Sequence, residues 1–277
     1  MDKNDNKYIF EDTLRRIRES SVLSDAVRKS IENEKLILEK DDYTPSGDIF
    51  YAEEARIVVS RKRTLEAAAG YKGMKTAVLN FASAVSPGGG VRGGSFAQEE
   101  SICRCTTLYP CLKTQYLWDN FYDPHRNGFD RRNTDDTIYT PCVICFKQDE
   151  LYPVIMEDQY WFPVNVITTA APDLKWPKYP GERGCVDLSD EELMALHIKR
   201  AKRILSIAAG EGNEAVVLGA FGCGAFHNPP RLVAEAFRSV IEEGFLHSFK
   251  FIEFAVYTNP FREDNGNAGI FSGVFGV

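Results

Sequence analysis

Residues 75–100 read KTAVLNFASAVSPGGGVRGGSFAQEE, and they contain a strand, a glycine-rich loop and the start of a helix. The apolar character of residues 75–81 predicts a buried strand. Further apolar runs predict strands at residues 55–60, 164–169, 215–220 and 251–257. Between them, amphipathic patterns predict helices at residues 64–69, 96–112, 193–209 and 229–243. Strands that alternate with helices in this way indicate an α/β fold whose sheet is covered on both faces.

The composition is that of an ordinary globular protein. The 277 residues fit one α/β domain with an accessory segment, and the hydrophobic fraction of 44% allows a sizeable core. The formal net charge is −7, with no run of lysine and arginine that would neutralise nucleic-acid phosphates. The small basic cluster Arg61-Lys62-Arg63 is typical of a solvated turn. We therefore expect no direct nucleic-acid binding, and an anionic ligand would have to be bound locally by backbone N–H groups.

The cysteines and the N-terminus indicate where the protein works. Seven cysteines are an odd number, which excludes a fully paired disulfide framework. The sequence shows no secretory leader and no apolar run long enough to span a membrane. We expect a cytoplasmic setting without membrane contact. Cys142 and Cys145 could suggest zinc, but they fall in a predicted strand and would point to opposite faces, so core packing is favoured and no metal is expected.

The chain divides near residue 50. Apolar residues at helical spacing predict an N-terminal helical accessory segment over residues 1–50, which Pro45-Ser46-Gly47 brings to an end. Residues 51–277 then form the main domain. Within it, residues 118–133 are rich in Asp, Asn, Arg and aromatic side chains, and we interpret them as a long insertion or lid.

Two glycine-rich loops each follow a predicted strand. Residues 88–94 hold five glycines, which cost conformational entropy but let the main chain approach a ligand and turn its N–H groups toward it. Glycine content alone fits a mobile surface loop equally well. The second loop, residues 218–230, reads LGAFGCGAFHNPP and is neither a Walker loop nor a complete dinucleotide fingerprint. Because ligands bind beyond the carboxyl ends of such strands, two loops of this kind could hold one diphosphate from both sides.

Two adjacent glutamates, Glu99 and Glu100, stand at the start of the helix after the first loop. Neighbours on a helix point about 100° apart, so one carboxylate can hold a sugar hydroxyl while the other meets a scissile bond. An acid at neutral pH would need burial or a nearby phosphate to raise its pKa. The alternative is a simple stabilising interaction with the helix dipole.

Gly88-Gly89-Gly90, followed after seven residues by Gln98-Glu99-Glu100, resembles the signature of poly(ADP-ribose) glycohydrolases, in particular the microbial-type branch. The second loop resembles the diphosphate loop of that family, including Phe226. The resemblance is strongest over residues 55–115 and 215–260. It implies a three-layer α/β/α macrodomain over residues 51–277, with a mixed, mostly parallel central sheet and no cofactor.

The same resemblance implies hydrolysis of the ribose–ribose O-glycosidic bond, with release of ADP-ribose mainly from chain ends. Glu100 would protonate the departing ribose oxygen and then activate water, through an oxocarbenium-like transition state. Glu99 would hold ribose hydroxyls. No motif marks the residue that contacts adenine, and Tyr257 is a candidate only from its position at the end of the last predicted strand. The residues implied to bind substrate are Asn80, Gly88, Gly89, Gly90, Gln98, Gly222, Cys223, Gly224, Ala225 and Phe226.

Two other functions stay open on the sequence. A non-catalytic ADP-ribose-binding macrodomain would keep the pocket, although the intact Gln98-Glu99-Glu100 argues against it. A hydrolase of another ADP-ribosyl derivative, such as a mono-ADP-ribosyl ester or a base adduct, would share the same residues. The expected partner is an ADP-ribose polymer or an ADP-ribosylated protein.

Overall fold

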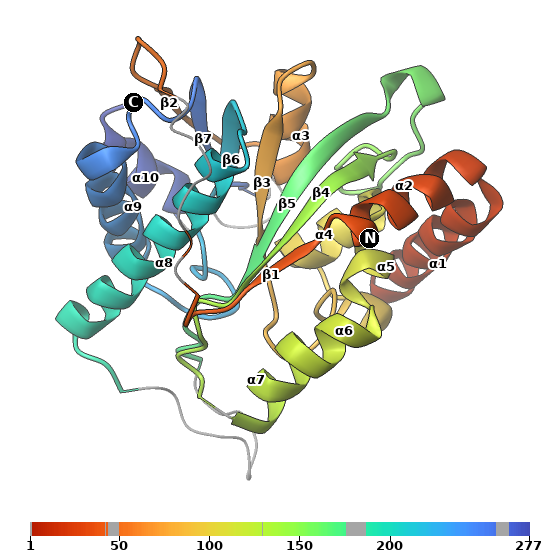
Figure 1. Ribbon diagram of the computed structural model, residues 1–277, viewed down its shortest axis with the longest axis horizontal. Helices are drawn as coiled ribbons and strands as arrows, with labels where there is room; N and C mark the ends of the chain where they lie inside the picture. Colours follow the sequence, from red (N-terminus) through yellow and green to blue (C-terminus); the bar gives the residue numbers. More distant parts are fainter. Residues whose placement is uncertain (1, 42, 44–49, 129, 176–186, 259–265) are drawn as a thin grey trace.

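A seven-stranded sheet runs through the centre of the computed structural model, which describes residues 2–41, 43, 50–128, 130–175, 187–258 and 266–277 (Figure 1). The strand order is β1-β4-β5-β3-β6-β7-β2. Neighbours from β5 to β2 are parallel, whereas β4 runs antiparallel to both β5 and β1. The mixed, mostly parallel sheet is therefore confirmed. The strands are β1 Lys35–Ile37, β2 Arg56–Ser60, β3 Thr76–Phe81, β4 Thr137–Cys145, β5 Phe162–Thr169, β6 Ala215–Leu218 and β7 Phe251–Ala255.

Strand β3 shows why the sheet is covered on both faces. Its side chains alternate, so that Ala77 and Leu79 enter one hydrophobic core and Val78 enters the other, all fully buried. The first core is closed by α8 Asp190–Gly210, α9 Pro230–Gly244 and α10 Asn267–Phe275. The second is closed by α3 Thr64–Ala68, α4 Gln98–Cys105 and α5 Leu108–Leu112. Figure 1 shows the two helical layers on opposite sides of the sheet, which confirms the three-layer macrodomain-like arrangement.

Helix boundaries follow local signals, with one correction. Helix α8 starts at the predicted capping box, where Ser189 Oγ accepts from the Glu192 N–H and the Glu192 carboxylate accepts from the Ser189 N–H. The single helix predicted over residues 96–112 is wrong, because α4 ends at Cys105 and α5 begins at Leu108. Thr106 between them has extended backbone and forms a bridge with Cys145, so pairing with the end of β4 interrupts the helix.

The N-terminal part of the chain forms two helices as expected, but a following strand also contributes to the sheet. Helices α1 Lys3–Glu19 and α2 Ser21–Glu32 precede β1, which pairs with β4 at the sheet edge. Helix α1 packs against the α4–α5 layer, where the rings of Phe10 and Tyr109 meet edge to face at 4.8 Å. Pro45, Ser46 and Gly47 lie outside the described residues, and the domain boundary near residue 50 stays a prediction.

Residues 118–128 of the segment 118–133 are helical, and residues 130–133 form a turn. It contains a π-helical turn, η3 Trp118–Tyr122, and α7 Asp123–Gly128, preceded by α6 Gln115–Leu117. Phe121 and Tyr122 are fully buried, so this half of the segment belongs to the core layer. Short 3-10 turns complete the fold at η1 Ala69–Tyr71, η2 Val91–Gly93 and η4 Asp158–Tyr160. Among the described residues, none of the helices combines the length and apolar character needed to cross a bilayer.

Candidate active site

The two glycine loops lie side by side because their strands are neighbours in the sheet. We call residues 82–97 the first glycine loop, which follows β3, and residues 219–229 the second glycine loop, which follows β6. Strands β3 and β6 pair in parallel, so both loops leave the same sheet edge. The rings of Phe81 and Phe221 lie 5.7 Å apart across the junction. At Gly219 a Cβ would lie 2.8 Å from the Ala255 carbonyl oxygen, so this tight junction requires glycine.

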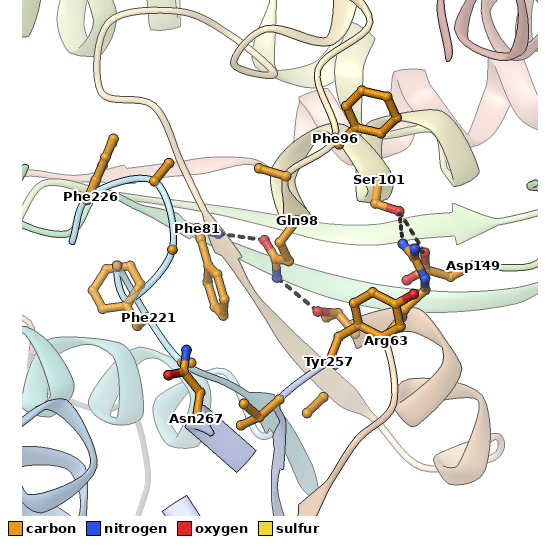
Figure 2. A pocket seen from close by; sticks show the side chains of 18 of the residues that line it. Arg63, Phe81, Phe96, Gln98, Ser101, Asp149, Phe221, Phe226, Tyr257 and Asn267 are labelled. Atoms are coloured by element: carbon orange, nitrogen blue, oxygen red, sulfur yellow. Dashed lines mark hydrogen bonds and ion pairs between the residues drawn. The ribbon is translucent and has the colours of Figure 1, made fainter. Parts of the chain in front are cut away.

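A cavity of about 390 Å³ lies where the second glycine loop faces the start of α4 (Figure 2). This volume falls in the range of small-molecule sites. Its lining includes six residues that the sequence singled out, namely Gln98, Gly222, Gly224, Ala225, Phe226 and Tyr257.

The second glycine loop keeps most of its backbone donors free. Within the described residues, the N–H groups of Gly222, Gly224, Ala225 and Phe226 have no protein acceptor. By contrast, Cys223 N–H donates to Ala220 O at 3.1 Å, and its thiol contacts Phe221 O at 3.6 Å. Burial raises the pKa of the Cys223 thiol to about 12. The backbone-donor role predicted for Gly222, Cys223, Gly224 and Ala225 is therefore available to three of these four residues, and not to Cys223. The N–H of Phe226, which the sequence singled out only for contact with the distal ribose, is a fourth available donor.

Glu99 and Glu100 lie together beneath the glycine triplet, Gly88 to Gly90. Gly90 N–H donates to Glu100 Oε1 at 2.7 Å, and Ser83 N–H donates to Glu99 Oε2 at 2.8 Å. Asn80 Nδ2 lies 3.5 Å from Glu99 Oε1. Two buried oxygens of this cluster, Glu100 Oε2 and Asn80 Oδ1, have no hydrogen-bond partner among the described residues. Such orphaned acceptors in a native structure indicate a place for a ligand or an ordered water.

The cluster of carboxylates does not line the 390 Å³ cavity. Helix α4 connects the cavity with the carboxylate cluster. Its residues Gln98 and Ser101 line the cavity. Glu99 and Glu100 lie between them in the chain. The structure therefore brings the predicted residues together as two adjacent groups. One is the cavity with the second glycine loop, and the other is the acidic cluster under the first.

The carboxylates themselves require glycine at position 89 of the triplet. Gly88 and Gly89 have φ of +66° and +58°, a region that favours glycine. A Cβ on Gly89 would lie 2.6 Å from Glu100 Oε1 and 2.8 Å from Glu99 Oε2. The sequence predicted close approach of this loop to a ligand, whereas Gly89 N–H donates to Ser86 O and Gly90 N–H to Glu100. The main chain of the triplet therefore holds the Glu100 carboxyl group in place.

Burial changes the pKa of one member of the pair. It raises the pKa of Glu99 well above the ordinary value, and repulsion from Glu100 adds to the shift, against the opposing effect of the Ser83 N–H. Burial and the neighbouring carboxylate thus both favour the neutral form of Glu99.

Gln98 has a structural function that the sequence did not reveal. Its Oε1 accepts from the Phe81 N–H at 2.9 Å, and its Nε2 donates to Leu79 O at 2.6 Å. A further bond from Nε2 reaches Thr64 Oγ1 at 3.0 Å (Figure 2). These bonds fix the start of α4 to β3 and α3, and direct contact of Gln98 with substrate stays a prediction.

A polar cluster at the far end of the cavity was missed by sequence reasoning. Arg63 lies with its guanidinium 4.2 Å from the Tyr257 ring centroid and donates to Ser101 Oγ at 3.2 Å. Ser101 in turn donates to Asp149 Oδ1 at 2.7 Å (Figure 2). Burial raises the pKa of Asp149, while the charge of Arg63 lowers it. The solvated turn predicted for Arg61-Lys62-Arg63 is wrong at Arg63, whose side chain is only 15% exposed.

The second glycine loop is fixed from below by Asn228. Its side-chain Nδ2 donates to Pro172 O at 2.7 Å and to Gly222 O at 3.1 Å, and it is 2% exposed. Because Nδ2 donates, Oδ1 is the acceptor that lies 2.8 Å from His197 Nε2, and that nitrogen carries the proton. Burial lowers the pKa of His197 to about 4, so the ring is neutral at pH 7. His227, in the loop itself, is exposed.

Comparisons with known proteins agree with this architecture. The family described as microbial-type PARG, catalytic domain, matches residues 8–148, about half of the chain. The poly(ADP-ribose) glycohydrolase (PARG) from Thermomonospora curvata superposes with a TM-score of 0.80 at 27% identity, over 98% of this chain and 100% of that one. The same enzyme bound to the inhibitor ADP-HPD gives 0.77 at 28% identity, over 98% and 99%.

A third solved structure, the PARG from Deinococcus radiodurans in complex with ADP-ribose, has a TM-score of 0.72 at 27% identity and covers 90% of this chain and 96% of its own. No curated protein matches the chain. The chain belongs to the microbial-type PARG catalytic-domain family.

Replacing Asn228 with alanine should destabilise the protein. The change leaves Pro172 O, Gly222 O and the His197 Nε2–H without their partner, and buried unsatisfied groups cost about 1–3 kcal/mol. We expect the free energy of unfolding, measured by chemical denaturation, to fall by that amount. The matched control is Asn120→Ala, an exposed amide bonded to Tyr116 O, which should change it by less than about 0.5 kcal/mol. Equal effects of the two changes would contradict the role of Asn228.

The stability of the fold should fall in mild acid because of His197. Its pKa is lowered in the folded state from 6.5 to about 4, so only the unfolded chain takes up this proton as the pH falls between those values. The contribution of neutral His197 to the free energy of unfolding is complete above pH 6.5 and is lost as the pH falls toward 4. The free energy of unfolding should fall by up to about 3 kcal/mol over this range. Denaturation curves at several pH values measure it. His197→Gln should flatten this pH dependence and the exposed-site control His227→Gln should not; an unchanged slope in His197→Gln would contradict the assignment.

Proposed function

We propose that this protein hydrolyses the ribose–ribose O-glycosidic bond of ADP-ribose polymer and releases ADP-ribose, with Glu100 as the catalytic acid. The observation that carries the assignment is the buried Glu100 Oε2, which has no hydrogen-bond partner among the described residues, while the Gly90 N–H holds the other oxygen of the same carboxyl group. This oxygen keeps its hydrogen-bonding capacity for a substrate oxygen that reaches the acidic cluster. Family membership supports the reaction class.

The ligand would extend from the cavity across the second glycine loop to the triplet. Adenosine would occupy the cavity, where Phe221 and Tyr257 offer aromatic surface and Arg63 a planar cation. The four free N–H groups of the second glycine loop would hold the pyrophosphate. The distal ribose would then lie over the acidic cluster, with Phe226 packed against it.

The chemistry follows from the two orphaned oxygens. Glu100 would give its proton to the departing ribose oxygen as the C–O bond breaks, through an oxocarbenium-like transition state. Water would then attack the anomeric carbon and return a proton to the Glu100 carboxylate. Asn80 Oδ1 and Glu99 would bind ribose hydroxyls, and the nearby pyrophosphate would stabilise the positive charge that develops.

We also expect ADP-ribose to be released mainly from chain ends. The expected partner is an ADP-ribose polymer or an ADP-ribosylated protein, without direct nucleic-acid binding. The expected setting is cytoplasmic. The setting is supported by the six described cysteines, all of them free thiols.

Glu100→Gln should abolish turnover and keep ligand binding. The change removes the proton donor but keeps the shape, so release of ADP-ribose from automodified polymer should fall by about 10²–10⁴-fold. ADP-ribose affinity, measured by calorimetry, should stay within about twofold, because the cavity and the second glycine loop are unchanged. Glu235→Gln, an exposed carboxylate on α9, is the control and should behave as wild type.

The same assay separates the alternatives. A wild-type protein that binds ADP-ribose without releasing it from any substrate would be a non-catalytic binder. Turnover of mono-ADP-ribosylated protein but not of polymer would indicate a hydrolase of another derivative. Full activity of Glu100→Gln would contradict the assignment of the acid.

A further inference from the structure

Helix α1 makes a direct polar contact with the first glycine loop. Asn6 is fully buried, and its Nδ2 donates to Gly94 O at 3.0 Å and to Ser95 O at 3.4 Å. Gly94 has φ of +77°, and a Cβ there would collide with the backbone of Lys3. The start of α1 and this part of the loop are therefore in backbone contact, with Asn6 as the polar link.

A short series of contacts leads from Asn6 to the proposed acid. Ser95 N–H donates to Gly90 O at 3.2 Å, and a Cβ on Gly90 would collide with Ser95 Oγ. Gly90 N–H is the donor to Glu100 Oε1. The position of Ser95 therefore fixes the position of Gly90, and Gly90 in turn fixes the carboxyl group.

Helix α1 also contacts α4, the helix that carries Glu100. Thr13 Oγ1 of α1 donates to Arg104 O, one turn beyond Glu100 on α4, at 2.5 Å. The buried Arg104 guanidinium donates from Nη1 to Ser95 O at 2.7 Å. Helix α4 is therefore also hydrogen-bonded to the first glycine loop. Helix α1 thus contacts both partners, the loop through Asn6 and the helix through Thr13.

The side-chain amide of Asn6 contributes through its Nδ2 donor and not through its Oδ1 acceptor. Its Oδ1 is buried without a hydrogen-bond partner among the described residues, which costs free energy that an apolar side chain of similar size would not cost. The reverse orientation of the amide would point Oδ1 at two carbonyl oxygens. The Nδ2 bonds to Gly94 and Ser95 therefore account for an asparagine at this buried position.

We infer that Asn6 is a positioning residue for the Glu100 carboxyl group, acting through Ser95 and Gly90, and that α1 is part of the catalytic unit. The inference rests on the proposed function, since it assigns Asn6 to the same reaction. Helix α1, which the sequence indicated only as part of an accessory segment, would thus support the catalytic step.

Steady-state kinetics on the full chain test this, with polymer as substrate and free ADP-ribose as binding probe. Asn6→Ala removes the link, and Asn6→Asp keeps the volume but replaces the donor with an acceptor. Both should lower kcat by about 10- to 100-fold, as expected for a small displacement of a catalytic group. KM and ADP-ribose affinity should stay within about twofold, because the cavity lies on other elements.

Two control variants separate positioning from loss of stability. Asn4→Ala changes an exposed asparagine of the same helix and should leave all parameters unchanged. Ile17→Ala removes a buried α1 side chain that packs away from the loop, so it should lower the melting temperature without the fall in kcat. The comparison is made at a temperature where circular dichroism shows every variant folded, and Asn6→Asp replaces Asn6→Ala if the latter does not fold.

The outcomes are distinct. A loss of kcat in the Asn6 variants well beyond that of Ile17→Ala, at unchanged ADP-ribose affinity, supports the inference. Asn6 variants whose kcat equals that of Ile17→Ala overturn it while leaving the proposed function intact. A wild-type protein that releases no ADP-ribose overturns the proposed function, and the inference with it.

Discussion

The hydrogen bond from the Gly90 N–H to Glu100 Oε1 is the interaction on which the site depends. It requires backbone close to the carboxylates, where a Cβ on Gly89 would collide with Glu99 and Glu100 and a Cβ on Gly90 would collide with Ser95. It occupies one oxygen of Glu100, and the other is buried without a partner in the described part of the chain. The loop sequence, the start of α4 and the packing of α1 are all arranged around this one contact.

The two glycine loops perform different tasks although they resemble each other in sequence. In the first, the Gly90 N–H donates to the Glu100 carboxylate, whereas four N–H groups of the second have no acceptor among the described residues. Each is fixed by a buried asparagine outside the glycine run, Asn6 for the first and Asn228 for the second. In the second loop, the four N–H donors stand on a backbone that Asn228 holds fixed. Donors held in place before a ligand arrives are what electrostatic preorganisation requires.

Much of this architecture could be predicted from the sequence, because apolar runs and capping signals are local. Strand β3, the capping box at Ser189 and the glutamates at the start of α4 follow from such patterns. The partners of Arg63 could not be predicted, since Ser101 and Asp149 come from distant segments that only the folded sheet brings together.

Other features escaped prediction for related physical reasons. The break at Thr106 depends on pairing with Cys145, and the β1 edge strand depends on β4, both long-range contacts. The inward direction of the triplet N–H groups also escaped, because glycine content shows where the chain can bend and not which group it then faces.

A crystal structure of the wild-type protein with ADP-ribose would show which carboxyl group faces the scissile position. We expect the pyrophosphate on the N–H groups of Gly222, Gly224, Ala225 and Phe226, and the anomeric carbon of the distal ribose within about 3–3.5 Å of Glu100 Oε2. A distal ribose turned away from Glu100, with another carboxyl group nearer the anomeric carbon, would contradict it.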